Sequence, residues 1–353
     1  MINIGIIGIY GLVGKAILQS LELLEYDNCD KYCFYFYGTS NNIIQFNNNQ
    51  IKVTTFSFEC LHLLDYCILA IDNNNAREIY EYTQKHKLKL IIIDNSSEYR
   101  LHTDVPLCIP EINSNTISKI KILPMLISNP NCVTTILCMC LKPLLQLANI
   151  NKILVSTYQA ASGAGYRGLE ELQIQTKQIS QEKLTNQEKL TNQEKLTNQE
   201  KLTTNFWKKQ YVYNVFSHNS KINSDNLYNE EELKLINETK KILQINPKIT
   251  ATCIRVPTLR SHCISAHVEF DKIIEKEQII EILSTFSGIK ILDNIEENQF
   301  PEPIISSEKT EIYVGRIRSD IDDKTCWNFF ISGDQLLKGA GYNSVQILDY
   351  LIK

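Results

Sequence analysis

The stretch NIGIIGIYGLVG, residues 3–14, carries an apolar run into a turn in which Gly8, Gly11 and Gly14 are three residues apart. Residues 13–24 follow with apolar side chains at helical spacing. A strand, a glycine-rich turn and a helix in this order favour a dinucleotide-binding turn, because the helix N-terminus presents N–H donors to a pyrophosphate. The spacing is GxxGxxG and not GxGxxG, so a purely structural tight turn is the alternative.

The rest of the first hundred residues alternates between strand-like and helix-like segments. Strand-like runs occupy 32–37, 66–71 and 88–93, and an amphipathic helix is predicted over 76–86. Strands separated by helices predict a parallel sheet with helices on both faces. The fold class is therefore α/β, with a Rossmann-like dinucleotide-binding domain at residues 1–130.

A different pattern begins near residue 152. Strand-like segments at 153–160, 251–258 and 262–270 are separated by long polar insertions, which favours an α+β organisation. We predict a second domain, catalytic and dimerising, over residues 131–334. The helical segment 335–353 is predicted to return to the first domain.

The composition disfavours several classes of protein. At 353 residues the chain is long enough for two cores, and 43% hydrophobic with 22% charged residues is typical of a soluble globular protein. The net charge of −4 disfavours nucleic acid as a partner, and no apolar stretch is long enough to span a membrane. The N-terminus lacks the basic start and the cleavage site of a signal peptide, so we expect a cytoplasmic protein. Its eleven cysteines are then expected to be reduced, and they include no CxxC pair that would indicate a metal site.

Residues 181–204 consist of four tandem hexads, QEKLTN three times and then QEKLTT. Their hydrophobicity is too low to form a core, and a period of six does not keep the leucines on one helix face. We predict a solvent-exposed insertion within a surface helix or loop. An arm that binds a partner is the alternative.

The end of the second predicted strand bears on the choice of cofactor. It reads YGTSNN, residues 37–42, without the acidic residue that would bind the ribose 2′-hydroxyl of NAD. Thr39, Ser40 and Asn41 can donate hydrogen bonds to a 2′-phosphate, which favours NADP. Ordinary turn residues would give the same composition.

One cysteine has a distinctive setting, in SNPNCVTT at residues 128–135. Ser128 or Asn129 is predicted to cap a helix, with Pro130 in its first turn. Cys132 would then lie in the first turn, where unpaired N–H groups lower a thiol pKa and favour the thiolate. A buried structural thiol is the competing interpretation.

Polar clusters elsewhere supply groups that a reactive thiol needs. DNSSEYR (94–100) ends a strand with Arg100, a candidate anion ligand, and STYQAASGAGYRG (156–168) ends a strand with Gln159 before a glycine turn. RVPTLRSHC (255–263) contains Arg255 and His262, and a histidine suits proton exchange with a thiol. On composition alone the competing histidines are His102, His218 and His267.

These segments together resemble the aspartate-semialdehyde dehydrogenase family. The matching stretches, in family order, are GIYGLVG, DNSSEYR with DVPLCIPEIN, SNPNCVTT, STYQAASGAGYRGLEEL, YNEEELK, RVPTLRSHC, YVGRIR and GDQLLKGA, and only about 177–209 falls outside. The resemblance implies a homodimer that uses NADPH to convert L-aspartyl-4-phosphate to L-aspartate-4-semialdehyde through a cysteine thioester. Such an enzyme would serve the biosynthesis of lysine and diaminopimelate, threonine and methionine.

The resemblance also implies a role for individual residues. Cys132 matches the nucleophile, His262 the general acid/base and Gln159 the residue that orients the substrate. The positions that match substrate ligands are Arg255 for the α-carboxylate, Glu231 for the amine, and Arg100 with Lys234 for the phosphate. The glycine turn and the resemblance together assign cofactor contacts to Gly8, Tyr10, Gly11, Leu12, Val13, Gly14, Thr39, Ser40, Ser162, Gly163, Gly165 and Gln335. No metal ligand is expected.

Some positions depart from the family pattern. Many members have Ala-Thr where this chain has Ile9-Tyr10, and many have a basic residue where it has Thr39-Ser40. N-acetyl-glutamyl-phosphate reductase shares the cysteine chemistry and is the nearest alternative, although its substrate has no free amine for Glu231. A catalytically silent NADP-binding scaffold is the alternative from another class. Preference for NADP over NAD and the choice between dimer and tetramer stay open.

Overall fold

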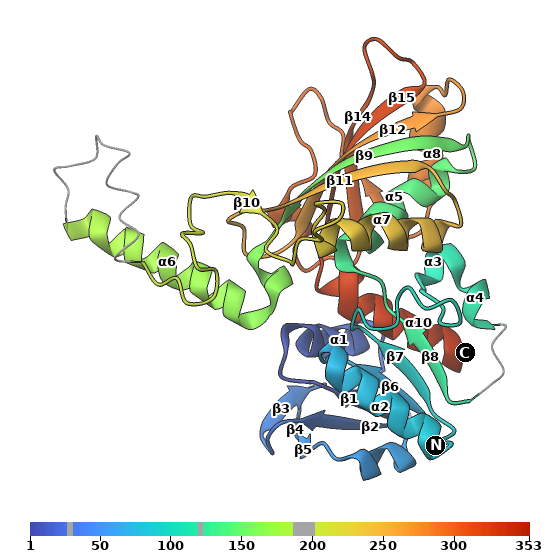
Figure 1. Cartoon of the computed structure of the whole chain (residues 1–353), viewed down its shortest axis with the longest axis vertical. Coiled ribbons are helices and arrows are strands. Elements are labelled where there is room, and N and C mark those ends of the chain that lie inside the picture. Colours follow the sequence, from blue (N-terminus) through green and yellow to red (C-terminus); the bar gives the residue numbers. More distant parts are fainter. Residues whose placement is uncertain (27–30, 119–122, 186–201) are drawn as a thin grey trace.

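The computed structural model describes residues 1–26, 31–118, 123–185 and 202–353. Two β-sheets lie one beyond the other along the long axis of the molecule, and one long helix projects sideways from between them (Figure 1). The N-terminus belongs to one sheet, and the C-terminal helix lies against that same sheet (Figure 1).

The first sheet is entirely parallel, with the order β5-β2-β1-β6-β7-β8. Its strands are β1 (Ile2–Ile7), β2 (Tyr32–Gly38), β5 (Thr54–Thr55), β6 (Tyr66–Leu69), β7 (Ile91–Asp94) and β8 (Met125–Ser128). Its faces are covered by α1 (Leu12–Leu23) and α10 (Tyr342–Ile352) on one side, and by α2 (Asn73–Lys85) and the 3₁₀ helix η1 (Phe58–Leu63) on the other. The strands read as continuous apolar runs because both faces are buried.

The strand order places a crevice at the carboxyl end of β1. The chain first adds β2 on one side of β1 and later adds β6 on the other, which is the arrangement that opens a ligand site in parallel sheets. Gly8 has φ +93°, and a Cβ there would lie 2.2 Å from the Ala70 carbonyl oxygen. The turn into α1 therefore requires glycine at this position. A small hairpin of β3 (Ile43–Phe46) and β4 (Asn49–Lys52) lies outside the main sheet.

The second sheet is mixed, with the order β10-β11-β9-β12-β15-β14-β13. Its strands are β9 (Ile150–Gln159), β10 (Phe216–Ser217), β11 (Lys248–Arg255), β12 (His262–Phe270), β13 (Ile289–Ile291), β14 (Ile312–Ser319) and β15 (Cys326–Gly333). One face packs on α5 (Cys132–Leu144), α7 (Glu230–Leu243) and α8 (Lys276–Thr285), which share its largest apolar core. Short helices α3 (Pro110–Asn113), α4 (Asn115–Ser118) and α9 (Pro303–Ser306) complete the connections.

The sequence predicted one helical segment over residues 335–353. In the structure this segment is not one regular helix. β15 leads into a five-residue π-helix, η5 (Leu337–Gly341), and only then does α10 begin. Asp334 accepts the N–H groups of Leu336 and Leu337, so its side chain organises the entry to the π-helix. α10 then packs on α1 through Val345 and Leu348.

The projecting helix is α6 (Gly165–Thr185), which follows the 3₁₀ turn η2 (Ala161–Ala164). The predicted hexad insertion begins on this helix, but its residues 186–201 lie outside the described residues. Where the chain resumes, Thr203 donates its N–H to Gln178 of α6 at 3.0 Å. In the part of the chain that the structure describes, no helix is long and apolar enough to cross a membrane.

Candidate active site

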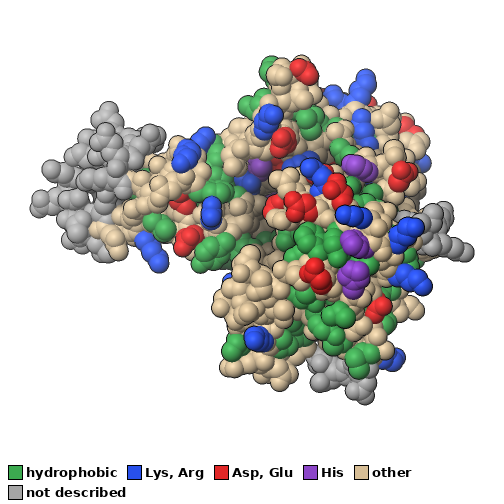
Figure 2. Space-filling view, turned by 60° about the horizontal axis from the view of Figure 1, so that its bottom comes forward, with side chains coloured by type: hydrophobic (Ala, Val, Ile, Leu, Met, Phe, Trp, Pro, Cys, Tyr) green, Lys and Arg blue, Asp and Glu red, His purple; other side chains and the backbone are tan. Residues whose placement is uncertain are grey.

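A cavity of about 440 Å³ lies between the two sheets. One side is lined by Ala70, Asn95 and Asn129, which directly follow β6, β7 and β8. The space-filling view shows the molecule hollowed beside α6, with Lys, Arg and His side chains gathered at the rim (Figure 2). The carboxyl ends of the parallel strands thus face the second sheet across a polar space.

Sheet register assembles the other side of the cavity. Gln159 ends β9 and lies opposite Arg255, which ends the parallel strand β11. His262 begins the antiparallel strand β12, next to Cys263, which pairs with Tyr158. Strand ends that are a hundred residues apart in sequence therefore meet at one edge of the sheet.

Cys132 is the first residue of α5, and the predicted cap is wrong. Ser128 still belongs to β8, and the Asn129 side chain is engaged by Asn95 and Asn343. The cap is Asn131, whose side chain accepts the N–H groups of Val133 and Thr134 at 3.0 and 3.3 Å. The helix starts later than expected, directly at the thiol.

The predicted lowering of the Cys132 pKa by the helix N-terminus is also wrong. Burial raises its pKa to about 12, and the Glu231 carboxylate adds to the effect. Arg100, Arg255 and the Val133 N–H lower the pKa, but by less than burial raises it. A charge at the first turn of a helix is stabilised only modestly, and the cost of desolvating a thiolate is larger. Cys132 rests as a neutral thiol.

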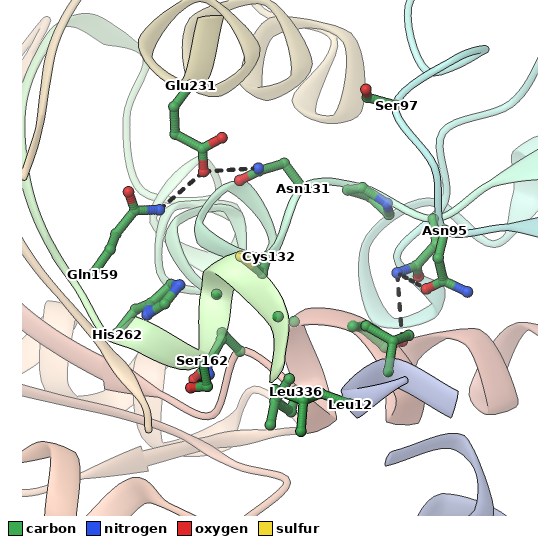
Figure 3. Close-up of a pocket in the computed structure, with 18 of the residues that line it drawn as sticks. Leu12, Asn95, Ser97, Asn131, Cys132, Gln159, Ser162, Glu231, His262 and Leu336 are labelled. Atoms are coloured by element: carbon green, nitrogen blue, oxygen red, sulfur yellow. Dashed lines mark hydrogen bonds between the residues drawn. The ribbon is translucent and has the colours of Figure 1, made fainter. Parts of the chain in front are cut away.

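His262 has one nitrogen engaged and the other directed into the cavity. Its Nδ1 accepts the Ala160 N–H at 3.0 Å, so in the neutral ring the proton sits on Nε2. Burial and the Arg255 charge lower the pKa of His262 to about 3, so the ring is neutral at physiological pH. In this state the ring offers an N–H donor beside Cys132 (Figure 3).

Glu231 lies in the first turn of α7 and is held by two amides. Its Oε1 accepts hydrogen bonds from Gln159 Nε2 at 2.9 Å and from Asn131 Nδ2 at 3.0 Å (Figure 3). Burial alone would raise the pKa of Glu231, but His218, the two amides and Lys234 lower it to about 2. A buried carboxylate is thus ionised at the wall of the cavity.

Two buried arginines face the same space. Arg255 donates to the Ala160 carbonyl at 3.0 Å and to His218 Nε2 at 2.6 Å. Arg100 donates to the Asn95 carbonyl at 2.8 Å and forms an ion pair with Glu238 at 3.3 Å. Arg255 has no carboxylate within 4.0 Å among the described residues.

Three buried polar atoms of this cavity have no partner within the described chain. They are Arg100 Nε, Gln159 Oε1 and His262 Nε2. Buried polar atoms are almost always hydrogen-bonded, so unsatisfied ones that converge on a cavity indicate a bound polar ligand. A nucleophile, two cations, a carboxylate and an N–H donor around one space suit covalent chemistry on a small charged substrate.

Comparison with known proteins agrees with this geometry. Two family models match, "Semialdehyde dehydrogenase, NAD binding domain" at residues 3–120 and "Semialdehyde dehydrogenase, dimerisation domain" at residues 141–338. The chain is 36% identical to the aspartate-semialdehyde dehydrogenase of Prochlorococcus marinus over 99% of its own length and 96% of that protein.

The chain belongs to the aspartate-semialdehyde dehydrogenase family.

Solved structures of the family confirm the predicted two-part α/β fold. Aspartate semialdehyde dehydrogenase II from Vibrio cholerae, complexed with ASA, has a TM-score of 0.87 at 27% identity and covers 100% of this chain and 98% of that one. The enzyme from Francisella tularensis has a TM-score of 0.90 at 25% identity, and both chains are covered completely. Membership of the family makes this chain an oxidoreductase with an NAD(P)-binding domain.

A second cavity of this semialdehyde dehydrogenase, about 310 Å³, fits a nucleotide. It shares Gly11 and Ala70 with the first cavity and is lined further by Gly8, Tyr10 and Thr39. Gly11 is the N-cap of α1, and a Cβ there would meet only the Gly8 carbonyl, at 3.6 Å, so its open side leaves room for a phosphate. The two adjacent cavities therefore fit a dinucleotide that runs from the first sheet toward Cys132.

The other predicted cofactor positions divide into two groups. The first cavity is lined by Leu12, Val13, Ser162, Gly163, Gly165 and Gln335. Gly14 and Ser40 line neither cavity. A Cβ on Gly14 would lie 2.4 Å from the Gly8 carbonyl oxygen, and the Ser40 carbonyl accepts the Tyr10 hydroxyl at 2.7 Å. Both residues shape the turns that carry the site.

Three residues of the site were not singled out by sequence. Asn131 caps α5 and contacts Glu231, and Glu238 accepts the Asn131 N–H at 2.7 Å while pairing with Arg100. Glu238 lies seven residues after Glu231, so the helical period does place both on one face of α7. His218 was only one histidine among four, and it lines the cavity together with His262.

The remaining candidates lie elsewhere. His102 is exposed beside Tyr99, and His267 on β12 is hydrogen-bonded to Asn328 on β15. Among the described cysteines other than Cys132, all are buried except Cys33 and Cys60, which are half-buried. Within the described ranges, no group of three or more His, Cys, Asp or Glu side chains forms a metal site.

Proposed function

We propose that the enzyme reduces L-aspartyl-4-phosphate to L-aspartate-4-semialdehyde and phosphate, and that it serves lysine and diaminopimelate, threonine and methionine biosynthesis. The observation that carries the proposal is that three residues lining the same cavity as Cys132 each have an unsatisfied buried polar atom. NADPH, when bound across the two adjacent cavities, supplies the hydride.

The charges of the cavity suit both ends of this substrate. Arg255 is proposed to bind the α-carboxylate through its planar fork, and the ionised Glu231 to bind the α-amine. Gln159, whose Oε1 is free to accept, orients the substrate. Arg100 and Lys234 would hold the phosphate, because Arg100 Nε lacks a partner and Lys234 lines the same space.

The proposed chemistry begins at sulfur. Cys132 Sγ bonds to the acyl carbon while the carbon–oxygen bond to phosphate breaks, and the thiol proton leaves with the phosphate as HPO₄²⁻. The His262 Nε2–H and the Cys132 backbone N–H would donate to the carbonyl oxygen as negative charge develops there. For His262 to act as a base, its ring proton must shift to Nδ1, which would break the Ala160 bond.

The assembly is proposed to be a homodimer, since the match to a dimerisation domain covers residues 141–338. We propose the domain division 1–130 with 335–353, and 131–334. Its support is that the chain passes from the first sheet to the second between β8 and α5, and that α10 packs on α1. The small-molecule substrate would bind between the two domains.

Cys132→Ala tests the function. We expect phosphate-dependent reduction of NADP with aspartate semialdehyde to fall by several orders of magnitude, because nucleophile and partners act as a unit. Cys33→Ala, a half-buried cysteine on β2, is the matched control and should keep full activity. Turnover of Cys132→Ala near that of the control would contradict the proposal. Preference for N-acetyl-glutamate semialdehyde would favour the alternative reductase.

A further inference from the structure

The Arg255 guanidinium is held by neutral acceptors. Its nitrogens reach the Ala160 carbonyl and His218 Nε2, and no carboxylate within the described chain pairs with it. A carboxylate in the place of His218 would hold the guanidinium equally well but would also neutralise it. A neutral imidazole leaves the positive charge available to a ligand.

The tautomer of His218 follows from its neighbours. Arginine can only donate, so His218 Nε2 accepts, and the ring proton of a neutral imidazole must be on Nδ1. Nδ1 lies 3.1 Å from the Ser220 hydroxyl oxygen, which accepts a hydrogen bond from the Nδ1–H. The Ser220 N–H is directed at the same nitrogen from 3.3 Å, as the other tautomer would require, but the contact with Arg255 is shorter, at 2.6 Å, and is made by a charged donor.

The same hydroxyl connects the histidine to α7. Ser220 Oγ donates to Asn229 Oδ1 at 3.3 Å and accepts the Glu231 N–H at 3.2 Å. Asn229 is the N-cap of α7, in a capping box with Glu232. A continuous chain of hydrogen bonds therefore fixes Arg255 relative to Glu231, the two groups of opposite charge that face the cavity.

We propose that His218 is a positioning residue for the substrate carboxylate, holding the Arg255 guanidinium in place through a neutral hydrogen bond that preserves its charge. The inference rests on the proposed role of Arg255. The charged and titratable groups that face His218 are Arg255 on β11, Glu231 and Lys234 on α7, and His262 on β12. Burial and Arg255 lower the pKa of His218 to about 4, so the ring keeps its acceptor at physiological pH.

The test replaces His218 with leucine and with glutamine. His218→Leu should raise KM for aspartate semialdehyde roughly 10- to 100-fold, since one hydrogen bond to a charged group is lost. Its kcat and its KM values for phosphate and NADP should stay within about threefold of the wild type. His218→Gln keeps an oxygen near the position of Nε2 and should restore most of the loss. His86→Leu, an exposed histidine after α2, is the control and should change nothing.

Two results would overturn the proposal. One is an unchanged semialdehyde KM in His218→Leu, or a general loss in which kcat and all three KM values worsen together, as a structural defect would produce. The other is an undiminished effect of His218→Leu in an Arg255→Ala background, since the residue is inferred to act only through Arg255.

A binding measurement separates this inference from the proposed function. If the wild-type enzyme does not turn over aspartate semialdehyde, the function fails. Protection of Cys132 from iodoacetamide by L-aspartate, which has the same α-amino and α-carboxylate groups, still reports on the carboxylate site. His218→Leu should then raise the protecting concentration of L-aspartate by the same factor, and His218→Gln should restore it. Equal protection in the wild type and His218→Leu would refute the positioning role.

Discussion

At the scale of the residue, Cys132 lies where burial disfavours its thiolate before substrate binds. Burial and the Glu231 carboxylate raise its pKa, against the opposing effect of Arg100 and Arg255. An acyl phosphate bound as proposed would bring negative charge to the two arginines and take the thiol proton away with the phosphate. The thiol is therefore expected to become nucleophilic only as the leaving group departs, which protects it from other electrophiles.

The pH dependence of alkylation checks this interpretation. Because the pKa of Cys132 is raised to about 12, its thiolate fraction should grow about tenfold per pH unit. The rate of iodoacetamide reaction at the Cys132 peptide, followed by mass spectrometry from pH 7 to 9, should rise without a plateau. Glu231→Gln removes a nearby negative charge and should speed alkylation at pH 8, whereas Glu170→Gln, at an exposed position of α6, should not. A plateau near pH 7 would mean a lowered pKa after all.

At the scale of the element, α7 organises both halves of the cavity. Glu231, Lys234, Glu238 and Lys241 follow at intervals of three or four residues on one helix face. Lys241 Nζ donates to three carbonyls in the segment that begins at Arg100, at 2.6 to 2.8 Å. The helix thus holds the backbone around Arg100, while Glu238 holds its guanidinium.

The π-helix η5 is the second element on which the site depends. Gly339 packs directly on the start of α5, and a Cβ there would lie 2.7 Å from Cys132 Cβ and 3.1 Å from Cys132 Cα. Gly339→Ala should displace the thiol and lower kcat by about 10- to 100-fold, because small displacements of reacting groups are costly. Steady-state kinetics measures the loss, and circular dichroism should show an intact fold. Wild-type kcat in this variant would show that α5 yields without moving the thiol.

At the scale of the whole molecule, a buried lysine ties the C-terminal segment to the rest of the chain. Lys338 of η5 is fully buried, and its Nζ contacts Glu111 of α3 at 2.6 Å, Asn343 at 2.9 Å and Gln346 at 2.7 Å. The same segment supplies Gly339 to the site and α10 to the first sheet. The position of the two sheets relative to each other therefore depends on the contacts of Lys338.

Removing the lysine should destabilise the protein strongly. Lys338→Met leaves the Glu111 carboxylate buried without its cation, and the free energy of unfolding should fall by about 3–5 kcal/mol. Urea unfolding followed by tryptophan fluorescence measures the change. Lys353→Met breaks only the exposed pair with Asp349 and should leave the unfolding midpoint unchanged. Equal midpoints for the two variants would mean that the buried pair contributes nothing.

Local patterns in the sequence were sufficient for the fold class and for most of the residues that the structure brings together around the cavity. The strands and helices of the first sheet follow from apolar periodicity, because each element must bury its own face. The sequence placed Gln159, Arg255 and His262 at or near strand ends. In the structure Gln159 and Arg255 end strands, and His262 begins one. The local pattern could not identify the cap of α5, since Asn131 competes with two neighbours, Ser128 and Asn129, that are equally good caps in isolation.

By itself, then, the sequence determined which elements form and which residue types are available for chemistry, because those properties depend on neighbours along the chain. Only the tertiary structure decided the protonation of Cys132, the partner of Arg255 and which two of the four candidate histidines line the cavity. Each of these depends on burial and on groups brought together across a hundred residues or more by the sheet register and by α7. Desolvation and Coulomb interactions act through space, so they are set only when the chain has folded.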